Sequence, residues 1–108
     1  ADYWVGLASR IQAFESTQPA SAQISIYGAG FYGTYIASCL ADQERIKFFL
    51  DRDPYRHGRK LFGKTIIDPA LMPESIDTVF VGLNPAIARQ NIEMITSWEG
   101  RKIEFFYL

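Results

Sequence analysis

Three glycines in the spacing G-x-G-x-x-G, at Gly28, Gly30 and Gly33, constrain the fold of this chain more than any other feature of its sequence. The apolar run Ile24–Tyr27 before them predicts a short strand, and the apolar side chains of residues 31–41 recur at helical spacing. In a strand-to-helix turn of this kind the first glycine allows the tight turn, the second lets the backbone approach a pyrophosphate, and the third lets helix and strand pack closely. The spacing therefore predicts a turn of the dinucleotide-binding type.

An acidic residue follows the second predicted strand at the place where the same pattern requires one. Asp51 comes directly after the apolar run Ile46–Leu50 and lies 18 residues beyond Gly33. In dinucleotide-binding domains a carboxylate about 20 residues after the glycines accepts hydrogen bonds from ribose hydroxyls. The N–H groups that open the helix would point at phosphate oxygens, where the helix dipole favours negative charge. Phe31 and Tyr32 fill the variable positions of the turn, where side chains overhang a pyrophosphate or meet another domain.

A second interpretation of these features involves no ligand. A glycine-rich turn is needed for strand-to-helix packing even in domains that bind no cofactor, and Asp51 is equally explained as a residue that caps the loop after it. Asn84 follows a predicted strand at residues 78–83 and is placed to contact a cofactor ribose or a substrate. Together with Pro85 it also has the residue type of a helix N-cap. The predicted cofactor-binding residues are Gly28, Ala29, Gly30, Phe31, Tyr32, Gly33, Asp51, Arg52 and Asn84.

The identity of the nucleotide is only partly selected by these residues. A carboxylate at Asp51 suits a free ribose 2′-hydroxyl and repels a 2′-phosphate, so NAD is favoured over NADP. Arg52 argues the other way, because an arginine in this position can pair with a 2′-phosphate. S-adenosylmethionine is also bound by glycine turns, but the first strand ends in Ile26 and Tyr27, without the acidic residue that methyltransferases usually place before the glycines. The predicted cofactor is NAD, with S-adenosylmethionine and a nucleotide-sugar left as alternatives.

Apolar strands alternate with helical segments along the rest of the chain. Continuous apolar runs are typical of strands covered on both faces, as in parallel sheets. The alternation predicts an α/β fold, a small Rossmann-like three-layer sandwich with a mostly parallel sheet of about five strands and a preceding N-terminal helix. Residues 1–23 are predicted to form that helix and a linker, and residues 24–108 the nucleotide-binding domain. The other predicted elements are a strand at 65–67, a helical turn at 69–72, a strand at 78–83, a helix from Pro85 to Gly100 and a strand at 103–107.

The loop after Asp51 is rich in basic side chains but offers no catalytic set. These side chains are interpreted either as an electropositive rim for a phosphate or nucleotide-sugar, or as a solvated loop partly neutralised by Asp51 and Asp53. His57 is the single histidine, with no serine, cysteine or aspartate at catalytic spacing and no second metal ligand. No catalytic residue and no metal site is therefore predicted, and whether the protein is an enzyme stays open. The basic residues of this loop, five of the 11 in the chain, are Arg52, Arg56, Arg59, Lys60 and Lys64.

The composition narrows the range of partners. A chain of 108 residues with 11 basic and 12 acidic side chains gives no reason to expect nucleic acid, and no apolar run approaches the ~20 residues of a membrane span. The single cysteine, Cys39, fits a reducing compartment, so the expected location is the cytoplasm. The start at Ala1 and the apolar residues 105–108 predict a piece of a larger protein. The predicted partners are a nucleotide or nucleotide-sugar, other domains of that protein and a second copy in a homodimer.

The motif I-x-I-Y-G-A-G-x-x-G, the stretch D-R-D-P-x-x-x-G-R and the segment D-T-V-F-V-G-L-N-P together span residues 24–85. In this layout the chain resembles the Rossmann-like domain of sugar-modifying enzymes, found as the N-terminal module of nucleotide-sugar dehydratases and as the C-terminal domain of sugar C-methyltransferases. Residues 51–59 look most like the second. The resemblance implies a module that binds NAD or a nucleotide-sugar within a larger, methyltransferase-related enzyme, whose methyl donor and catalytic residues belong to another domain. The alternative is a non-catalytic structural or dimerisation domain that has lost its ligand.

Overall fold

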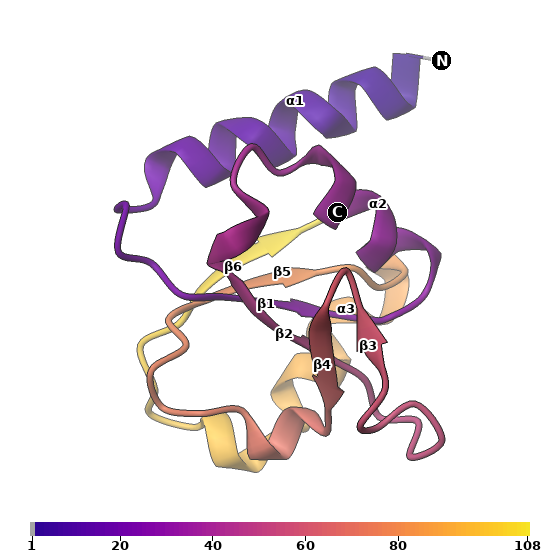
Figure 1. The fold of residues 1–108 in the computed structure, drawn as a ribbon, viewed down its shortest axis with the longest axis vertical. Coiled ribbons are helices and arrows are strands. Elements are labelled where there is room, and N and C mark those ends of the chain that lie inside the picture. The colour runs from indigo at the N-terminus through magenta and orange to yellow at the C-terminus, as the bar shows by residue number, and fades with distance from the viewer. Residues whose placement is uncertain (1) are drawn as a thin grey trace.

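Six strands form one sheet in the computed structural model, which describes residues 2–108 (Figure 1). The strands are β1 (Ile24–Tyr27), β2 (Ile46–Leu50), β3 (Lys60–Leu61), β4 (Lys64–Ile67), β5 (Thr78–Val81) and β6 (Glu104–Tyr107). They lie in the order β3-β4-β2-β1-β5-β6. Neighbours pair in parallel, except that β3 runs antiparallel to β4. The helices are α1 (Asp2–Thr17), α2 (Phe31–Cys39) and α3 (Pro85–Glu93), and short 3-10 turns precede β2, β5 and β6 at Gln43–Arg45, Pro69–Leu71 and Thr96–Trp98.

Helices cover both faces of the sheet. Successive side chains of a strand point to opposite sides, so the apolar side chains of both faces need a covering layer. In β1, Ile24 and Ile26 pack in the core under α1 and α2, whereas Tyr27 packs in the core under α3 (Figure 1). Every residue of β1 and β5 is buried. Strands covered on both sides in this way need the nearly continuous apolar sequences that both segments have.

The helix α1 shares its core with the sheet. Leu7 and Ile11 are buried in the same cluster as Ile26 and Phe80. The ring of Phe14 stands edge-on to that of Phe80, with 5.2 Å between the ring centroids. The helix therefore forms part of the layer that covers one face of the sheet. None of the helices formed by residues 2–108 has the length and apolar character that crossing a bilayer requires.

The predicted α/β class, the mostly parallel sheet and the preceding helix are confirmed. The predicted strand count was one too low, because β3 was interpreted as part of a loop. The helix predicted to reach Gly100 ends at Glu93. The chain turns there because the side chain of Trp98 is buried against the sheet and donates its indole N–H to the carbonyl of Pro69, at 2.9 Å.

The strands β3 and β4 are joined by a tight turn at Phe62 and Gly63, both with positive φ (51° and 74°). A two-residue turn with positive φ at both positions matches the twist of the strands in a hairpin, but its residues are usually Asn-Gly or Asp-Gly. Phe62 is tolerated there because its ring stacks on Phe49 of β2, with 6.2 Å between the centroids. The hairpin therefore forms without the residue pair that signals it in a sequence.

Candidate functional site

Two of the three glycines in the predicted turn are required by the packing of the fold. Gly28 has a φ of 102°, and a Cβ on it would lie 2.6 Å from the carbonyl oxygen of Gly82. A Cβ on Gly33 would overlap the carbonyl oxygen of Gly28. Gly82 follows β5, and a Cβ there would lie 2.8 Å from the backbone of Gly33. These three glycines let α2 cross β1 and β5 at backbone contact. No role was predicted for Gly82, although it lies in the segment D-T-V-F-V-G-L-N-P.

Gly30 differs from these three glycines because the fold makes no demand on it. Its φ of −96° is open to other residues, and the nearest atom to a Cβ placed on it is Nη1 of Arg56, at 3.8 Å. Gly30 is the N-cap of α2, and no side chain caps that end. The first hydrogen bond of the helix runs from the N–H of Thr34 to the carbonyl of Gly30, at 3.0 Å. The earlier N–H groups, those of residues 31–33, have no acceptor within the helix.

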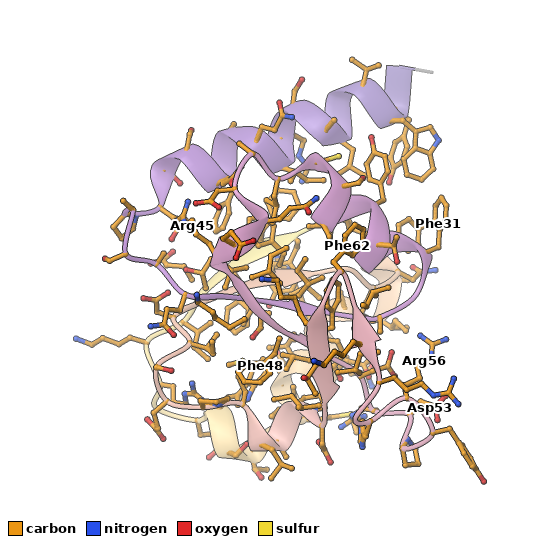
Figure 2. The ribbon with its side chains drawn as sticks, in the orientation of Figure 1. Phe31, Arg45, Phe48, Asp53, Arg56 and Phe62 are labelled. Atoms are coloured by element: carbon orange, nitrogen blue, oxygen red, sulfur yellow. The ribbon has the colours of Figure 1, made fainter. Side chains whose placement is uncertain are left out.

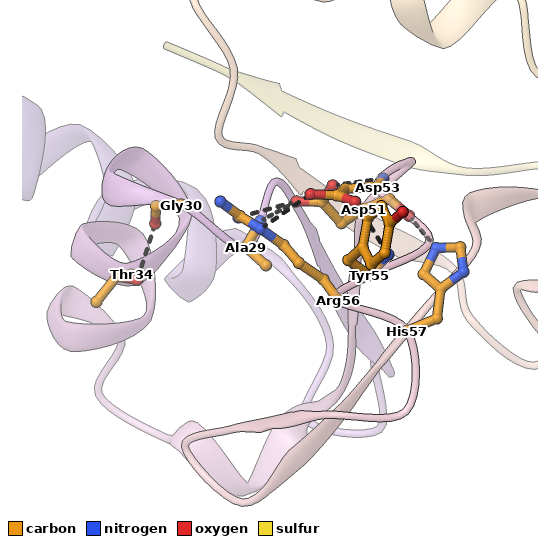
Figure 3. Close-up of polar contacts among 8 residues, drawn as sticks. All are labelled: Ala29, Gly30, Thr34, Asp51, Asp53, Tyr55, Arg56 and His57. Atoms are coloured by element: carbon orange, nitrogen blue, oxygen red, sulfur yellow. Dashed lines mark hydrogen bonds and ion pairs between the residues drawn. The ribbon is translucent and has the colours of Figure 1, made fainter.

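The Asp51 carboxylate lies against the glycine turn, where the sequence pattern placed it (Figure 3). Its Oδ2 accepts hydrogen bonds from the backbone N–H of Ala29, at 3.1 Å, and from Nη1 of Arg56, at 3.2 Å. Its Oδ1 accepts from the N–H of Asp53, at 2.9 Å. The side chain is 17% exposed. Asp51 thus fastens the glycine turn to the loop that follows β2, and these contacts match neither predicted role alone.

The loop after β2 folds back over the turn through a chain of polar contacts. Nε of Arg56 lies 3.8 Å from Oδ2 of Asp53, whose Oδ1 accepts from the N–H of Tyr55 at 3.0 Å. Nε2 of His57 lies 2.6 Å from the carbonyl oxygen of Asp51. Figure 2 shows Asp53 and Arg56 on this loop, close together at the edge of the molecule. The imidazole of His57 therefore holds the loop through the carbonyl group of Asp51.

The predicted basic rim is only partly assembled in the structure. Arg56 reaches the glycine turn, whereas Lys64 pairs with Glu44, which precedes β2, at 3.8 Å. Arg59, at the end of the loop, and Lys60, in β3, are exposed. Sequence reasoning grouped these basic residues and did not separate Arg56 from the others. The one available signal was its position, five residues after Asp51 in a loop able to turn back.

The remaining predicted site residues lie around the turn in different roles. Phe31, labelled in Figure 2, is 68% exposed. Its ring meets that of Trp4 of α1 edge-on, with 5.6 Å between the centroids. Tyr32 stacks on the same tryptophan, at 6.5 Å. Asn84 is the N-cap of α3, since its Oδ1 accepts from the N–H of Ala86 at 2.9 Å. Arg52 is exposed, and within residues 2–108 its side chain forms no hydrogen bond or ion pair.

Tyr27, the last residue of β1, carries a buried hydroxyl that has no hydrogen-bond partner among residues 2–108. Burial raises the pKa of this phenol above its ordinary value. The charge of Arg52 partly offsets the rise in pKa, and those of Asp51 and Asp68 add to it. An unpaired buried hydroxyl is destabilising because it has lost its water without gaining another partner.

We expect the substitution Tyr27→Phe to raise the free energy of unfolding by about 1 kcal/mol, since it removes that unpaired group. Urea unfolding at neutral pH measures this difference. Because the pKa of Tyr27 is raised in the folded state, the unfolded chain ionises first as the pH rises, and the wild type loses stability in alkali. The gap between variant and wild type should therefore widen above pH ~10. A variant that is less stable than wild type at neutral pH would show that the hydroxyl is hydrogen-bonded.

A cavity of about 540 Å³ lies away from the glycine turn, between α1 and the connection from α2 to β2. Its buried acid, Glu15, accepts hydrogen bonds from the N–H groups of Ala41, at 2.8 Å, and Asp42, at 3.1 Å. Arg45 donates to the carbonyl of Pro19, at 2.7 Å. Glu15 and Arg45 thus bind backbone groups of the chain and hold α1 to the segments next to it. They leave fewer polar groups for a ligand than the glycine turn does.

No family model matches the sequence, and no curated protein matches it. Solved structures do match the fold. The UDP-D-quinovosamine 4-dehydrogenase from Vibrio fischeri is 22% identical, with a TM-score of 0.61 over 82% of this chain and 79% of that one. RSP, a Rex-family repressor, is 16% identical, with a TM-score of 0.56 over 82% of this chain and 53% of that one. RSP in complex with beta-NADH matches over the same shares, at 15% identity and a TM-score of 0.50.

This chain therefore spans about half the length of the repressor chain. At these identities the likeness concerns the fold. Both matched proteins are Rossmann-like. The chain has a Rossmann-like α/β fold with an N-terminal helix packed on its sheet.

Proposed function

We propose that the domain binds a nucleotide with a diphosphate group, NAD or a nucleotide-sugar, at the glycine turn. The observation that carries this proposal is the contrast between Gly30 and the other glycines. Packing requires Gly28 and Gly33, whereas the space above Gly30 holds only the end of Arg56. The absence of a side chain there leaves the uncapped start of α2 accessible to a phosphate group.

The remaining residues of the turn suit the parts of such a ligand. The N–H groups of Phe31 and Tyr32 would bind phosphate oxygens, and Asp51 would bind ribose hydroxyls. A carboxylate in that position favours NAD over NADP, while Arg52 is the side chain available for a 2′-phosphate. S-adenosylmethionine fits less well, because it has no phosphate for the helix N–H groups. The similarity to a repressor solved with NADH and to a nucleotide-sugar dehydrogenase supports the same classes of ligand.

The domain is further proposed to work within a larger sugar-modifying enzyme, as the methyltransferase-like stretch at residues 51–59 suggested. In that arrangement the catalytic residues lie in another domain, and residues 24–108 supply the nucleotide site. Phe31 is exposed beside the turn, and we propose it as a contact for another domain.

One observation favours a second candidate, a structural domain without a ligand. Asp51 already accepts hydrogen bonds from Ala29, Asp53 and Arg56, so its carboxylate is occupied by groups of the chain itself. A domain that had lost its ligand would need these contacts only to hold the loop.

We expect the substitution Gly30→Ala to separate the two candidates. Its methyl group meets no atom closer than 3.8 Å, so stability should stay within about 0.5 kcal/mol of wild type. The affinity for a diphosphate ligand should fall by tenfold or more, roughly the loss of one charge-assisted contact. Isothermal titration calorimetry with NAD, NADP, S-adenosylmethionine and UDP-glucose measures it. The control is Gly6→Ala in α1, where a Cβ is also free of contacts and no ligand is expected. A folded wild type that binds none of the four compounds would rule out the proposed function.

A further inference from the structure

Arg56 places its guanidinium group at the amino end of α2. Its Nη1 lies 3.2 Å from Oδ2 of Asp51 and 3.8 Å from the position of a Cβ on Gly30. The side chain reaches across from the loop to the glycine turn, and its tip lies beside Ala29 (Figure 3). It is 43% exposed, so one side of the guanidinium group faces the solvent from which a ligand would arrive.

The charges around this point are unbalanced without Arg56. Asp51 and Asp53 both lie within 4 Å of its guanidinium group, at 3.2 and 3.8 Å. Two carboxylates so close to the start of α2 would repel a diphosphate, and one guanidinium group neutralises only half of their charge. Direct contact with a cation would offset this repulsion, and Arg56 is the basic side chain whose guanidinium group lies at the turn.

The guanidinium group has more donors than its present contacts use. It is planar and carries several N–H groups that fit carboxylate and phosphate oxygens in pairs. Its Nε faces Asp53 and its Nη1 faces Asp51. The contact to Asp53 can therefore persist while the terminal N–H groups change partner.

We infer that Arg56 is the diphosphate-binding residue of the site, and that it exchanges the Asp51 carboxylate for phosphate oxygens when the ligand binds. This inference rests on the proposed function. The exchange frees Oδ2 of Asp51 to accept from a ribose hydroxyl, so the phosphate and ribose contacts form together. Ligand binding would then require the phosphate groups. Nucleosides are expected to bind poorly, because without a phosphate Arg56 stays paired with Asp51.

The test compares Arg56→Ala with Arg59→Ala, which removes the same charge from an exposed side chain of the same loop. NAD and UDP-glucose are titrated against each variant of the full chain, together with adenosine and uridine as the matching nucleosides. Amide NMR shifts follow the titrations, since they also detect weak binding. Arg56→Ala should weaken binding of the diphosphate ligand by about tenfold to hundredfold, the loss expected for charge-assisted hydrogen bonds. The corresponding nucleoside should bind equally well or more tightly, because Asp51 is released. Arg59→Ala should change neither.

Three other outcomes have separate meanings. If Arg56→Ala weakens the nucleoside as much as the diphosphate ligand, Arg56 serves only to hold the loop, and the inference is wrong. If Arg59→Ala matches Arg56→Ala, net charge explains the effect, and the inference is wrong in that case too. If the folded wild type binds neither NAD nor UDP-glucose, the proposed function itself fails and this inference fails with it.

Discussion

Replacing Gly33 by alanine is expected to prevent the domain from folding, or to lower its free energy of unfolding by more than about 4 kcal/mol. The new Cβ would overlap the carbonyl oxygen of Gly28 and approach the side chain of Ile26. Both neighbours belong to the central strand or to the turn directly after it, and Ile26 is fully buried. The clash is with backbone, which no change of rotamer relieves. A loss of this size approaches the whole stability of a small domain, about 5–15 kcal/mol.

Chemical denaturation followed by circular dichroism measures the effect, and two other alanine substitutions are its controls. Gly30→Ala, three residues earlier in the same turn, should fold normally. Gly6→Ala lies inside α1 with no atom near its Cβ, and it should stabilise the protein by about 1 kcal/mol through helix propensity alone. A stable, folded Gly33→Ala variant would mean that α2 does not cross β1 at backbone contact.

The substitution Asp51→Ala is expected to lower the free energy of unfolding by about 3 kcal/mol, because it removes a partly buried carboxylate from three charge-assisted hydrogen bonds. The N–H groups of Ala29 and Asp53 lose their acceptor, and Arg56 is left with Asp53 alone. Any nucleotide binding should be lost as well, since both the turn and the ribose contact depend on this side chain. Urea unfolding measures the first effect and calorimetric titration the second.

The matched control for this prediction is Asp42→Ala. The carboxylate of Asp42 is exposed and accepts from a single backbone N–H, that of Glu44, at 3.1 Å. Its loss should lower the free energy of unfolding by about 1 kcal/mol, the usual effect of removing a cap. If the two variants are equally stable, Asp51 does not fasten the turn to the loop.

The sequence was sufficient to predict the class of fold and the position of Asp51 beside the glycine turn. Gly28, Gly33 and Asp51 lie at fixed separations in the sequence, and each meets a local requirement. Gly28 has a positive φ, Gly33 allows a close backbone approach, and Asp51 supplies a hydrogen-bond acceptor at the end of a strand. Such requirements can be stated from residue types alone. The apolar runs of β1, β2 and β5 are equally informative, because burial on both faces leaves few polar residues in them.

Features that depend on distant parts of the chain were not predictable in the same way. The bend after Glu93 depends on Trp98 meeting Pro69, and the turn at Phe62 depends on the ring of Phe49. Gly82 is required because the backbones of Gly33 and Tyr27 lie against it. The link from Asp51 to Arg56 belongs to the same group, since nothing in the order of residues indicates which basic side chain turns back. Contacts between residues so far apart in the sequence can be identified only when the packing of the chain is known.

The contact between α1 and β6 has a consequence for the order in which the chain folds. Arg10 donates to the carbonyl of Tyr107, 97 residues further along, at 3.0 Å, and its guanidinium group lies over the ring of Phe106. The ring of Phe14 also meets Phe106, with 5.5 Å between the centroids. During synthesis α1 leaves the ribosome long before β6, the strand that completes the surface on which it packs. The apolar face of α1 therefore stays partly exposed until β6 has been synthesised. The packing of α1 against β6 joins distant parts of the chain, so we expect it to be a slow step of folding.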